Sequence, residues 1–400
     1  MRILFADALD SSRVERLRAG GHECLVEPEL GPDDIGARLD GVDVLVVRST
    51  KVTAEAISAG DRLSLVVRAG AGINTIDCQA AADAGIYVSN VPGRNAVAVA
   101  ELTMGLLLAI DRRLVDNTVS LRAGQWNKRE YTKADGLMGK TMAIVGLGSI
   151  GLAVAERAGA FGIAVTALEK PGRTDAVEAQ ITANDIELVD SMEALLGGAD
   201  VVSVHVPSTG AGPMVDAEFL ALLREGAILL NTSRGDVVDE AALLDAIEAK
   251  NLRVGLDVWD DEPSAAVSEF HPALIDHPDV IGTHHIGAST TQAQEAIADG
   301  TLEVLERFAA GGIENCVNME TGRLGVSTIV VRHLDEVGVL AQVLAVLRAN
   351  GINVKQMSNE VFVGSVAAVA AIAVDKEPSS DAVAALESIE QVLGVAIRAV

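Results

Sequence analysis

Short apolar runs alternate with helix-like stretches over the first 90 residues of the chain. Parallel strands that are buried on both faces read as continuous apolar runs, so this alternation predicts a small parallel α/β domain. We expect its strands at RILFA, ECLVE, DVLVV, LVVR and IYV. An almost entirely apolar helix is predicted next, from Ala96 to about Leu121, and such a helix is expected to be buried between domains or subunits.

Between residues 141 and 169 the pattern predicts a strand, a glycine turn, a helix and a second strand. The turn reads GLGSIG. Its first glycine permits a tight bend, its second lets the backbone approach a pyrophosphate, and its third lets the helix pack on the strand. The helix N-terminus adds unpaired N–H groups that attract phosphate. We therefore expect a dinucleotide to contact Gly146, Gly148, Ser149, Ile150 and Gly151.

Glu169 ends the second strand of this unit, where a carboxylate accepts hydrogen bonds from the adenosine ribose hydroxyls. This position favours NAD, because the 2′-phosphate of NADP would meet a like charge. Lys170 and Arg173 follow closely and leave NADP as an alternative. A glycine motif alone is a weak signal, but strand, helix and acid at this spacing together indicate a dinucleotide site.

Strand-like runs continue at a β-then-α spacing to about Thr283 and predict a six- or seven-stranded doubly wound sheet. A helix from Gly287 to about Phe308 is then expected to lead back to the first domain. After Leu324 the pattern changes to a βαββαβ module of roughly 75 residues, which is large enough to fold alone.

The predicted fold class is therefore α/β. A Rossmann-type doubly wound dinucleotide domain is inserted in a smaller flavodoxin-like α/β substrate domain, and the βαββαβ module follows. The expected boundaries are residues 1–94 and 286–318 for the substrate-binding domain, 95–285 for the NAD-binding domain and 325–400 for the module.

Composition restricts the classes of partner. Apolar residues make up 49% of the chain and aromatic residues only 2%, so the cores must consist of small aliphatic side chains. A net charge of −26 disfavours nucleic acid and anionic membranes as partners. The three cysteines show neither disulfide nor metal-site spacing, no apolar run is long enough to span a bilayer, and the N-terminus does not read as a signal peptide. We expect a cytoplasmic protein without a metal site.

Three predicted strand ends carry polar groups that an apolar core would not need: Arg234 in NTSRG, Glu262 in DVWDDEP and His285 in THHIGAST. The carboxyl ends of strands in one parallel sheet converge on one crevice. An arginine can hold a carboxylate in a bidentate grip, a histidine can take a hydroxyl proton as hydride leaves, and a carboxylate can fix the tautomer of that histidine. This set suits oxidation of a 2-hydroxy acid by a nicotinamide. Taken singly, each residue could instead be a loop anchor, a solvated carboxylate or a structural histidine.

Two strands of the first domain end in arginines, Arg48 at the start of RSTKVT and Arg68 at the start of RAGAGINTID. These cations, with the backbone of Gly70 and Gly72, are candidates for anion binding, because ligands of open α/β sheets bind at strand carboxyl ends. The alternative is that both are surface arginines with buried stems.

These motifs, in this order along nearly the whole chain, resemble the D-isomer-specific 2-hydroxyacid dehydrogenases. The resemblance implies catalytic roles for Arg234, Glu262 and His285. His285 is preferred over the adjacent His284 because it directly precedes the Ile-Gly pair of the family motif. Further contacts that the resemblance implies are His205, Pro207 and Asp257 for the cofactor NAD, and Arg48, Lys51, Gly70, Gly72 and Asn95 for the substrate.

RSTKVT, RAGAGINTID and the final module resemble the phosphoglycerate-oxidising branch of this family, and the module looks like an ACT regulatory domain. In that branch the effector is serine, and the corresponding residues here are His333, Asp335 and Asn353. Asp335 stands where serine-inhibited members have Asn, so we expect weak or absent inhibition by L-serine. An ionised Asp only accepts hydrogen bonds, whereas Asn also donates.

The leading expectation is NAD-dependent oxidation of D-3-phosphoglycerate to 3-phosphohydroxypyruvate, the first step of L-serine biosynthesis. Reduction of hydroxypyruvate, glyoxylate or another 2-oxo acid is a close alternative. A dinucleotide-sensing interaction protein is a third possibility, since fold does not determine function. The expected partners are a small anionic 2-hydroxy acid and further copies of the chain in a homodimer or homotetramer.

Overall fold

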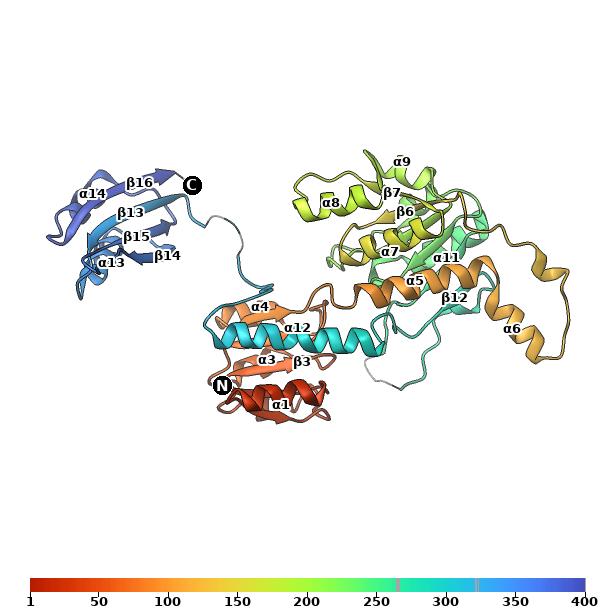
Figure 1. Ribbon diagram of the computed structural model, residues 1–400, viewed down its shortest axis with the longest axis horizontal. Coiled ribbons are helices and arrows are strands. Elements are labelled where there is room, and N and C mark those ends of the chain that lie inside the picture. Colours follow the sequence, from red (N-terminus) through yellow and green to blue (C-terminus); the bar gives the residue numbers. More distant parts are fainter. Residues whose placement is uncertain (264–266, 321, 323, 400) are drawn as a thin grey trace. The chain divides into compact units, whose positions relative to one another are not determined.

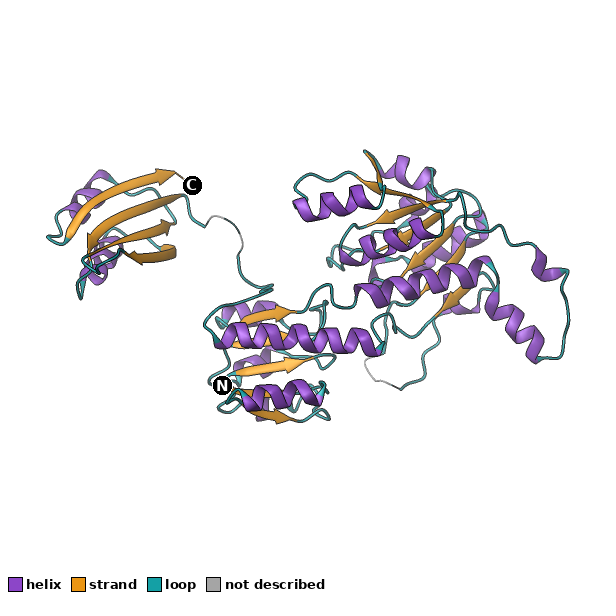
Figure 2. Ribbon diagram, viewed as in Figure 1, coloured by secondary structure: helices purple, strands orange, loops and turns teal. Residues whose placement is uncertain are grey.

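The computed structural model describes residues 1–263, 267–320, 322 and 324–399. The chain forms two compact units, Met1–Asn318 and Met319–Val400 (Figure 1). The first unit holds two parallel sheets and the second holds one antiparallel sheet (Figure 2). No helix in the described part of the chain is long and apolar enough to cross a membrane.

The N-terminal sheet has five parallel strands in the order β2-β1-β3-β4-β5. Its strands are apolar on both faces, because helices cover both, and the predicted runs form all five of them. Its elements are β1 (Arg2–Phe5), α1 (Ser11–Ala19), β2 (Glu23–Val26), α2 (Ile35–Arg38), β3 (Val44–Val47), α3 (Ala54–Ser58), β4 (Leu65–Arg68), α4 (Cys78–Asp83) and β5 (Tyr87–Asn90).

The first unit consists of two lobes, one built on this five-stranded sheet and one on the seven-stranded sheet described below. Helix α12 (Thr291–Ala309) leads back from the second lobe to the five-stranded sheet and packs on it with Ile297, Leu302 and Leu305. The helix starts four residues later than predicted, because the Thr290 hydroxyl accepts a hydrogen bond from the Ala293 amide and caps it there. The chain then runs along β5, where Cys316 pairs with Ser89.

The second sheet has seven parallel strands in the order β12-β11-β10-β9-β6-β7-β8, at the upper end of the predicted range. Two apolar clusters, one on each face, form its core. Its elements are β6 (Thr141–Val145), α7 (Ser149–Ala160), β7 (Ala164–Leu168), α8 (Asp175–Ala183), β8 (Glu187–Val189), α9 (Met192–Gly197), β9 (Val201–Val204), α10 (Ala217–Ala221), β10 (Ile228–Asn231), α11 (Glu240–Lys250), β11 (Arg253–Leu256) and β12 (Val280–Gly282).

The long apolar helix is shorter than predicted. Helix α5 (Ala96–Asp111) is buried as expected, but the chain breaks at Arg113, which adopts a left-handed conformation with φ of 47°. The following helix α6 (Leu114–Arg122) has no buried residue and projects from the lobe (Figure 1). The prediction of one buried helix to Leu121 was therefore wrong. The apolar residues of α6 suggested that the buried helix continues, but none of them is buried in the structure.

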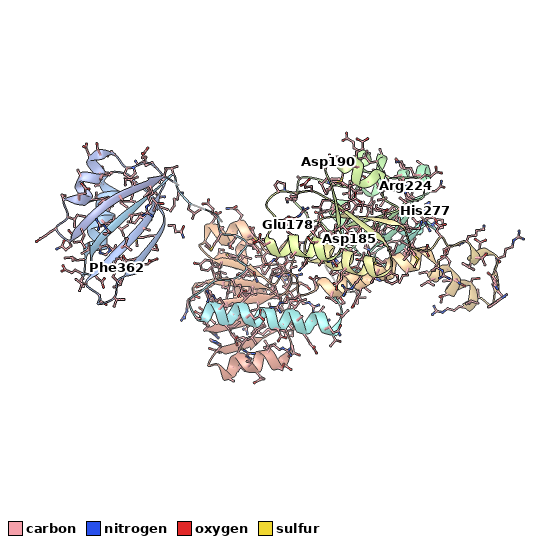
Figure 3. All side chains as sticks on the ribbon, turned by 45° about the horizontal axis from the view of Figure 1, so that its top comes forward. Glu178, Asp185, Asp190, Arg224, His277 and Phe362 are labelled. Atoms are coloured by element: carbon pink, nitrogen blue, oxygen red, sulfur yellow. The ribbon has the colours of Figure 1, made fainter. Side chains whose placement is uncertain are left out.

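The C-terminal unit has the predicted βαββαβ order. Its antiparallel sheet runs β14-β15-β13-β16, with its helices covering one face and residues such as Ile329, Ile372 and Val343 forming the core. Phe362, labelled in Figure 3, lies in the hairpin between β14 and β15 and is 57% exposed. The elements are β13 (Ser327–Leu334), α13 (Val339–Ala349), β14 (Val354–Val361), β15 (Ala367–Val374), α14 (Ser380–Glu387) and β16 (Val392–Ala399).

Candidate active site

The glycine turn between β6 and α7 has the geometry that a dinucleotide requires. Gly146 has φ of +104°, and a Cβ there would come within 3.0 Å of the His205 carbonyl oxygen. A Cβ at Gly151 would likewise come within 3.0 Å of the Gly146 carbonyl oxygen, so only glycine lets α7 approach the strand. At Gly148 a Cβ would meet nothing within 4 Å. Space is therefore open beside Gly148, where the pyrophosphate is expected.

Other residues that are predicted to contact the cofactor have the position or the exposure that such a contact needs. Ser149 begins α7, whose N-terminus at Gly148 has no side-chain cap, so its first amides are available for phosphate. Glu169 follows β7 and is exposed, as a residue that binds ribose hydroxyls should be. Pro207 is also exposed. These residues fit a bound dinucleotide.

His205 is held as a neutral side chain beside the turn. Burial lowers the pKa of its imidazole to about 4. Its Nε2 forms a hydrogen bond of 2.8 Å with the Ser203 hydroxyl, and its Nδ1 is buried without a partner among the described residues. His205 therefore contributes no charge to the site near neutral pH.

The structure joins two of the three predicted catalytic residues directly. Nδ1 of His285 lies 2.7 Å from Oε2 of Glu262. Among the described residues the neighbouring His284 has no carboxylate partner, which supports the choice of His285. Because an ionised carboxylate only accepts hydrogen bonds, Nδ1 must carry the proton of this bond. The neutral imidazole then has a free acceptor at Nε2, which is what a general base needs.

Glu262 is kept ionised by its surroundings. Burial acts to raise the pKa of its carboxyl, but the hydrogen bonds from His285 and from the Trp259 amide, with the nearby charge of Arg234, outweigh burial and lower it. The Trp259 amide donates to Oε1 at 2.8 Å, so both carboxylate oxygens are engaged. The side chain of Glu262 is 29% exposed and that of His285 is 49% exposed.

Trp259 ties together the loops that carry the three residues. Its indole Nε1 donates to the Thr283 carbonyl at 2.9 Å, which links the loops after β11 and β12. A Cβ at Gly235 would come within 3.0 Å of the Trp259 carbonyl, so this glycine lets the Arg234 loop lie against the same residue. The sequence did not single out Trp259, whose only signal was a large aromatic in a chain with two tryptophans.

Asp257 holds the loop of His285. Its carboxylate accepts from the Thr283 hydroxyl at 2.6 Å and from the amides of Ile286 and Gly287 at 2.8 Å each. The Asp257 carbonyl also accepts from the His285 amide at 2.7 Å. His285 sits in a left-handed conformation with φ of 50°, which these bonds maintain. Asp257 is 1% exposed, so the structure assigns its carboxylate to the loop, and its predicted contact with the cofactor stays a prediction.

Three arginines from the two lobes meet near this site. Burial first, and then the charges of Arg234 and Arg48, lower the pKa of the Arg68 guanidinium to about 10. Its Nε is buried without an acceptor among the described residues. A Cβ at Gly70 would collide with the Arg68 guanidinium, and one at Gly72 would collide with that of Arg234. Glycine at these two positions therefore leaves room for the arginines.

The other predicted substrate contacts are placed less decisively. Asn95 precedes α5 without capping it, and its Oδ1 is buried without a partner in the described part of the chain. Such an orphaned oxygen suits a ligand contact. Lys51 is exposed in the segment that follows Arg48.

The predicted effector residues do not form one cluster. His333 is 2% exposed, with Nδ1 at 2.7 Å from the Leu334 carbonyl and Nε2 at 3.0 Å from Oδ1 of Asn359. Both ring nitrogens are thus used inside the module, and Asn359 is a partner that the sequence did not indicate. Asp335 and Asn353 are both exposed; Asp335 precedes the first residue of α13 and Asn353 follows its last.

Comparison with known proteins identifies the family. A model of the D-isomer specific 2-hydroxyacid dehydrogenase NAD-binding domain matches residues 104–287. The D-3-phosphoglycerate dehydrogenase of Methanocaldococcus jannaschii is 37% identical over 323 residues, which are 80% of this chain and 60% of that protein. The hydroxypyruvate reductase of Thermotoga maritima is 38% identical over 310 residues, which are 77% of this chain and 97% of that protein.

A solved structure of a glyoxylate reductase from Paecilomyes thermophila superposes with a TM-score of 0.70 at 26% identity, covering 79% of this chain and 98% of that one. The chain therefore spans about 60% of the first of these relatives and nearly all of the other two. NAD is the cofactor of the matched domain. The chain belongs to the D-isomer-specific 2-hydroxyacid dehydrogenases.

Proposed function

We propose that this chain is an NAD-dependent dehydrogenase that oxidises D-3-phosphoglycerate to 3-phosphohydroxypyruvate, the first step of L-serine biosynthesis. The observation that carries the proposal is the cluster of Arg48, Arg68 and Arg234, with its largely buried Arg68 guanidinium. The resemblance to the Methanocaldococcus jannaschii phosphoglycerate dehydrogenase supports the same substrate.

The number of cations favours a phosphorylated acid. An unphosphorylated 2-hydroxy acid has one carboxylate, which the fork of Arg234 is suited to hold. The charges of Arg48 and Arg234 would then act on the largely buried Arg68 without a substrate phosphate to balance them, at a cost from like-charge repulsion and desolvation. A phosphate adds close to two negative charges and removes that cost. A chain of net charge −26 repels such a substrate at long range, so local cations have to provide the attraction.

The protein side of the reaction needs three groups. Arg234 binds the carboxylate and orients the C2 hydroxyl. Nε2 of His285 accepts the hydroxyl proton, while Glu262 stabilises the imidazolium that results. Bound NAD supplies the hydride acceptor. The same groups return the proton in the reverse direction, so a reductase and an oxidase of 2-hydroxy acids share this geometry.

A reductase of hydroxypyruvate or glyoxylate is the second candidate. It is favoured by the hydroxypyruvate reductase of Thermotoga maritima, because this chain covers 97% of that protein. A dinucleotide-sensing interaction protein would not require the hydrogen-bonded pair of His285 and Glu262.

We also propose that the chain forms a homodimer or homotetramer. The segment around α6 exposes apolar side chains that an isolated chain would leave in water. Val119 is 59% exposed and Trp126 is 82% exposed. A second copy would cover them.

The C-terminal module is proposed to be an ACT-like regulatory domain. It lies outside the unit that holds the catalytic groups, and its βαββαβ order matches the predicted module. Asp335 in place of Asn is expected to leave it weakly sensitive to L-serine.

Initial rates of NADH formation test the substrate assignment. The purified chain is given D-3-phosphoglycerate and, as matched acids without phosphate, D-glycerate and D-lactate. The reverse reaction is followed with hydroxypyruvate and glyoxylate. We expect kcat/KM to be highest for D-3-phosphoglycerate and inorganic phosphate to inhibit competitively. Equal or higher kcat/KM for the unphosphorylated acids would assign the chain to the reductase class, and no turnover of any acid would favour the interaction protein.

A further inference from the structure

Asp7 binds the loop that carries Arg48. It follows β1, and Oδ2 of its carboxylate accepts from three consecutive backbone amides: that of Arg48 at 2.7 Å, and those of Ser49 and Thr50 at 3.1 Å each. Strands β1 and β3 are parallel neighbours, with Phe5 opposite Val46, so the loops after them emerge at the same sheet edge. One carboxylate oxygen therefore sets the backbone of the whole turn after β3.

The charges that act on the Arg68 guanidinium include those of Arg48 and Arg234 and that of the Asp7 carboxylate. Its charge opposes the mutual repulsion of the three arginines. No ion pair joins Asp7 to any of them in the described part of the chain, and the three amides that donate to its Oδ2 hold the carboxylate against the backbone of the turn. The carboxylate thus fixes the backbone of Arg48 and leaves the guanidinium free.

We propose that Asp7 is a positioning residue that directs Arg48 toward the phosphate of the substrate and so sets the preference for phosphorylated acids. This inference rests on the proposed function, since it requires the arginine cluster to bind a phosphate. Asp7 acts through Arg48 and does not contact the reacting atoms.

A purely structural role is the competing explanation, because three amides in a turn need acceptors wherever they lie. Asp43 offers a matched comparison. Its Oδ2 accepts from the Arg2 amide at 2.7 Å, and its Oδ1 pairs with Arg62 at 2.8 Å. Asp43 lies immediately before β3, at the N-terminal end of this strand, whereas Arg48 follows its C-terminal end. Its loss should affect stability without affecting substrate preference.

Two substitutions separate geometry from charge at Asp7. Asp7→Asn removes the charge but keeps an oxygen that can accept from the three amides. Asp7→Glu keeps the charge but moves the acceptor by one methylene group. If Asp7 acts through the position of its acceptor oxygen, Asp7→Asn should retain the preference for the phosphorylated acid and Asp7→Glu should lose it. Asp7→Ala removes both acceptor and charge and should lose the preference most.

The test is KM for D-3-phosphoglycerate and for D-glycerate in the intact chain and in each variant, with the melting temperature as a second readout. We expect Asp7→Ala and Asp7→Glu to raise KM for D-3-phosphoglycerate about tenfold or more, which is the loss of one charge-assisted contact. KM for D-glycerate should change by less than about threefold, and Asp7→Asn should stay within about threefold for both acids. Asp43→Ala should lower the melting temperature while leaving the ratio of the two KM values unchanged. If Asp7→Ala does not fold, the Asn and Glu pair decides.

A double-mutant cycle adds the link to Arg48. In an Arg48→Ala background, Asp7→Glu should have no further effect on KM for D-3-phosphoglycerate, because the side chain it positions is gone. Equal factors for both acids, or an Asn variant as impaired as Glu, would overturn the inference while the proposed function stands. A parent enzyme that does not prefer the phosphorylated acid would instead overturn the proposed function, and this inference with it.

Discussion

Gly148, the second glycine of the turn, allows cofactor binding to be separated from folding. It has φ of −84° and ψ of −169°, an extended conformation open to any residue, and an added Cβ would meet nothing within 4 Å. Gly148→Ala should therefore leave the free energy of unfolding of the cofactor-free protein within about 0.5 kcal/mol of the parent. The new methyl group would occupy the space expected for the pyrophosphate and break its hydrogen bonds to the first amides of α7.

The expected loss follows from the strength of those bonds. A hydrogen bond to a charged group contributes about 1.5–3 kcal/mol, so losing one lowers NAD affinity roughly tenfold to more than a hundredfold. NAD at about 100 times its Kd stabilises the parent by about 2.7 kcal/mol, which corresponds to roughly 5–11 °C in melting temperature. At the same NAD concentration, a hundredfold weaker site would provide only about 0.4 kcal/mol, a shift of under about 2 °C.

Differential scanning fluorimetry with and without NAD measures both effects in one experiment. Gly151→Ala is the control, because its Cβ would clash with the Gly146 carbonyl and should lower the melting temperature of the cofactor-free protein itself. A Gly148→Ala protein that keeps the full NAD shift would refute the reasoning, since the pyrophosphate would then not lie on this turn.

Three further outcomes are expected. His285→Ala should lower kcat about 10²- to 10⁴-fold and His284→Ala much less, and equal losses in steady-state kinetics would contradict the assignment of the base. The pKa of His205 is lowered to about 4 in the folded protein, against about 6.5 in the unfolded chain. Between these values only the unfolded chain takes up the proton, so the free energy of unfolding is highest above about pH 6.5 and falls as the pH is lowered toward 4. Urea titrations should show about 2 kcal/mol less stability at pH 5 than at pH 7.5 from this residue, and His205→Gln should lack that part of the decline. The parent enzyme should be inhibited weakly or not at all by L-serine and Asp335→Asn more strongly, and potent L-serine inhibition of the parent would contradict this prediction.

The two parallel sheets were predictable because their determinants are local. Apolar runs of strand length, glycines at a fixed spacing and an acid at the next strand end are properties of short segments. The break between α5 and α6 was not predictable in this way. The side chain of the left-handed Arg113 contacts the Glu130 carboxylate at 2.7 Å and the Tyr131 ring at 5.1 Å. Both partners are distant in the sequence. The apolar residues of α6 suggested a continuation of the buried helix, although none of them is buried.

The residues of the candidate site also differ in whether local sequence or contacts between distant segments reveal them. Arg234, Glu262 and His285 could be recognised because they lie in the segments that follow buried strands. Asp7 could not, because its role depends on β1 and β3 being neighbours, which the sequence does not state. Asp257 could be recognised as a site residue only by resemblance, and its bonds to the loop of His285 appear only once that loop is folded.

The arrangement of the acids explains how an acidic protein keeps a cationic site. Three carboxylates of the site loops accept from N–H or O–H donors: Asp7 from three amides through Oδ2, Glu262 from His285 and the Trp259 amide, and Asp257 from Thr283 and two amides. A carboxylate that is satisfied in this way gains less from swinging toward a guanidinium, because it would have to give up charge-assisted bonds to do so. These acids therefore shape the loops of the site without forming an ion pair to Arg48, Arg68 or Arg234 among the described residues, which leaves the three guanidinium groups available to an anionic substrate.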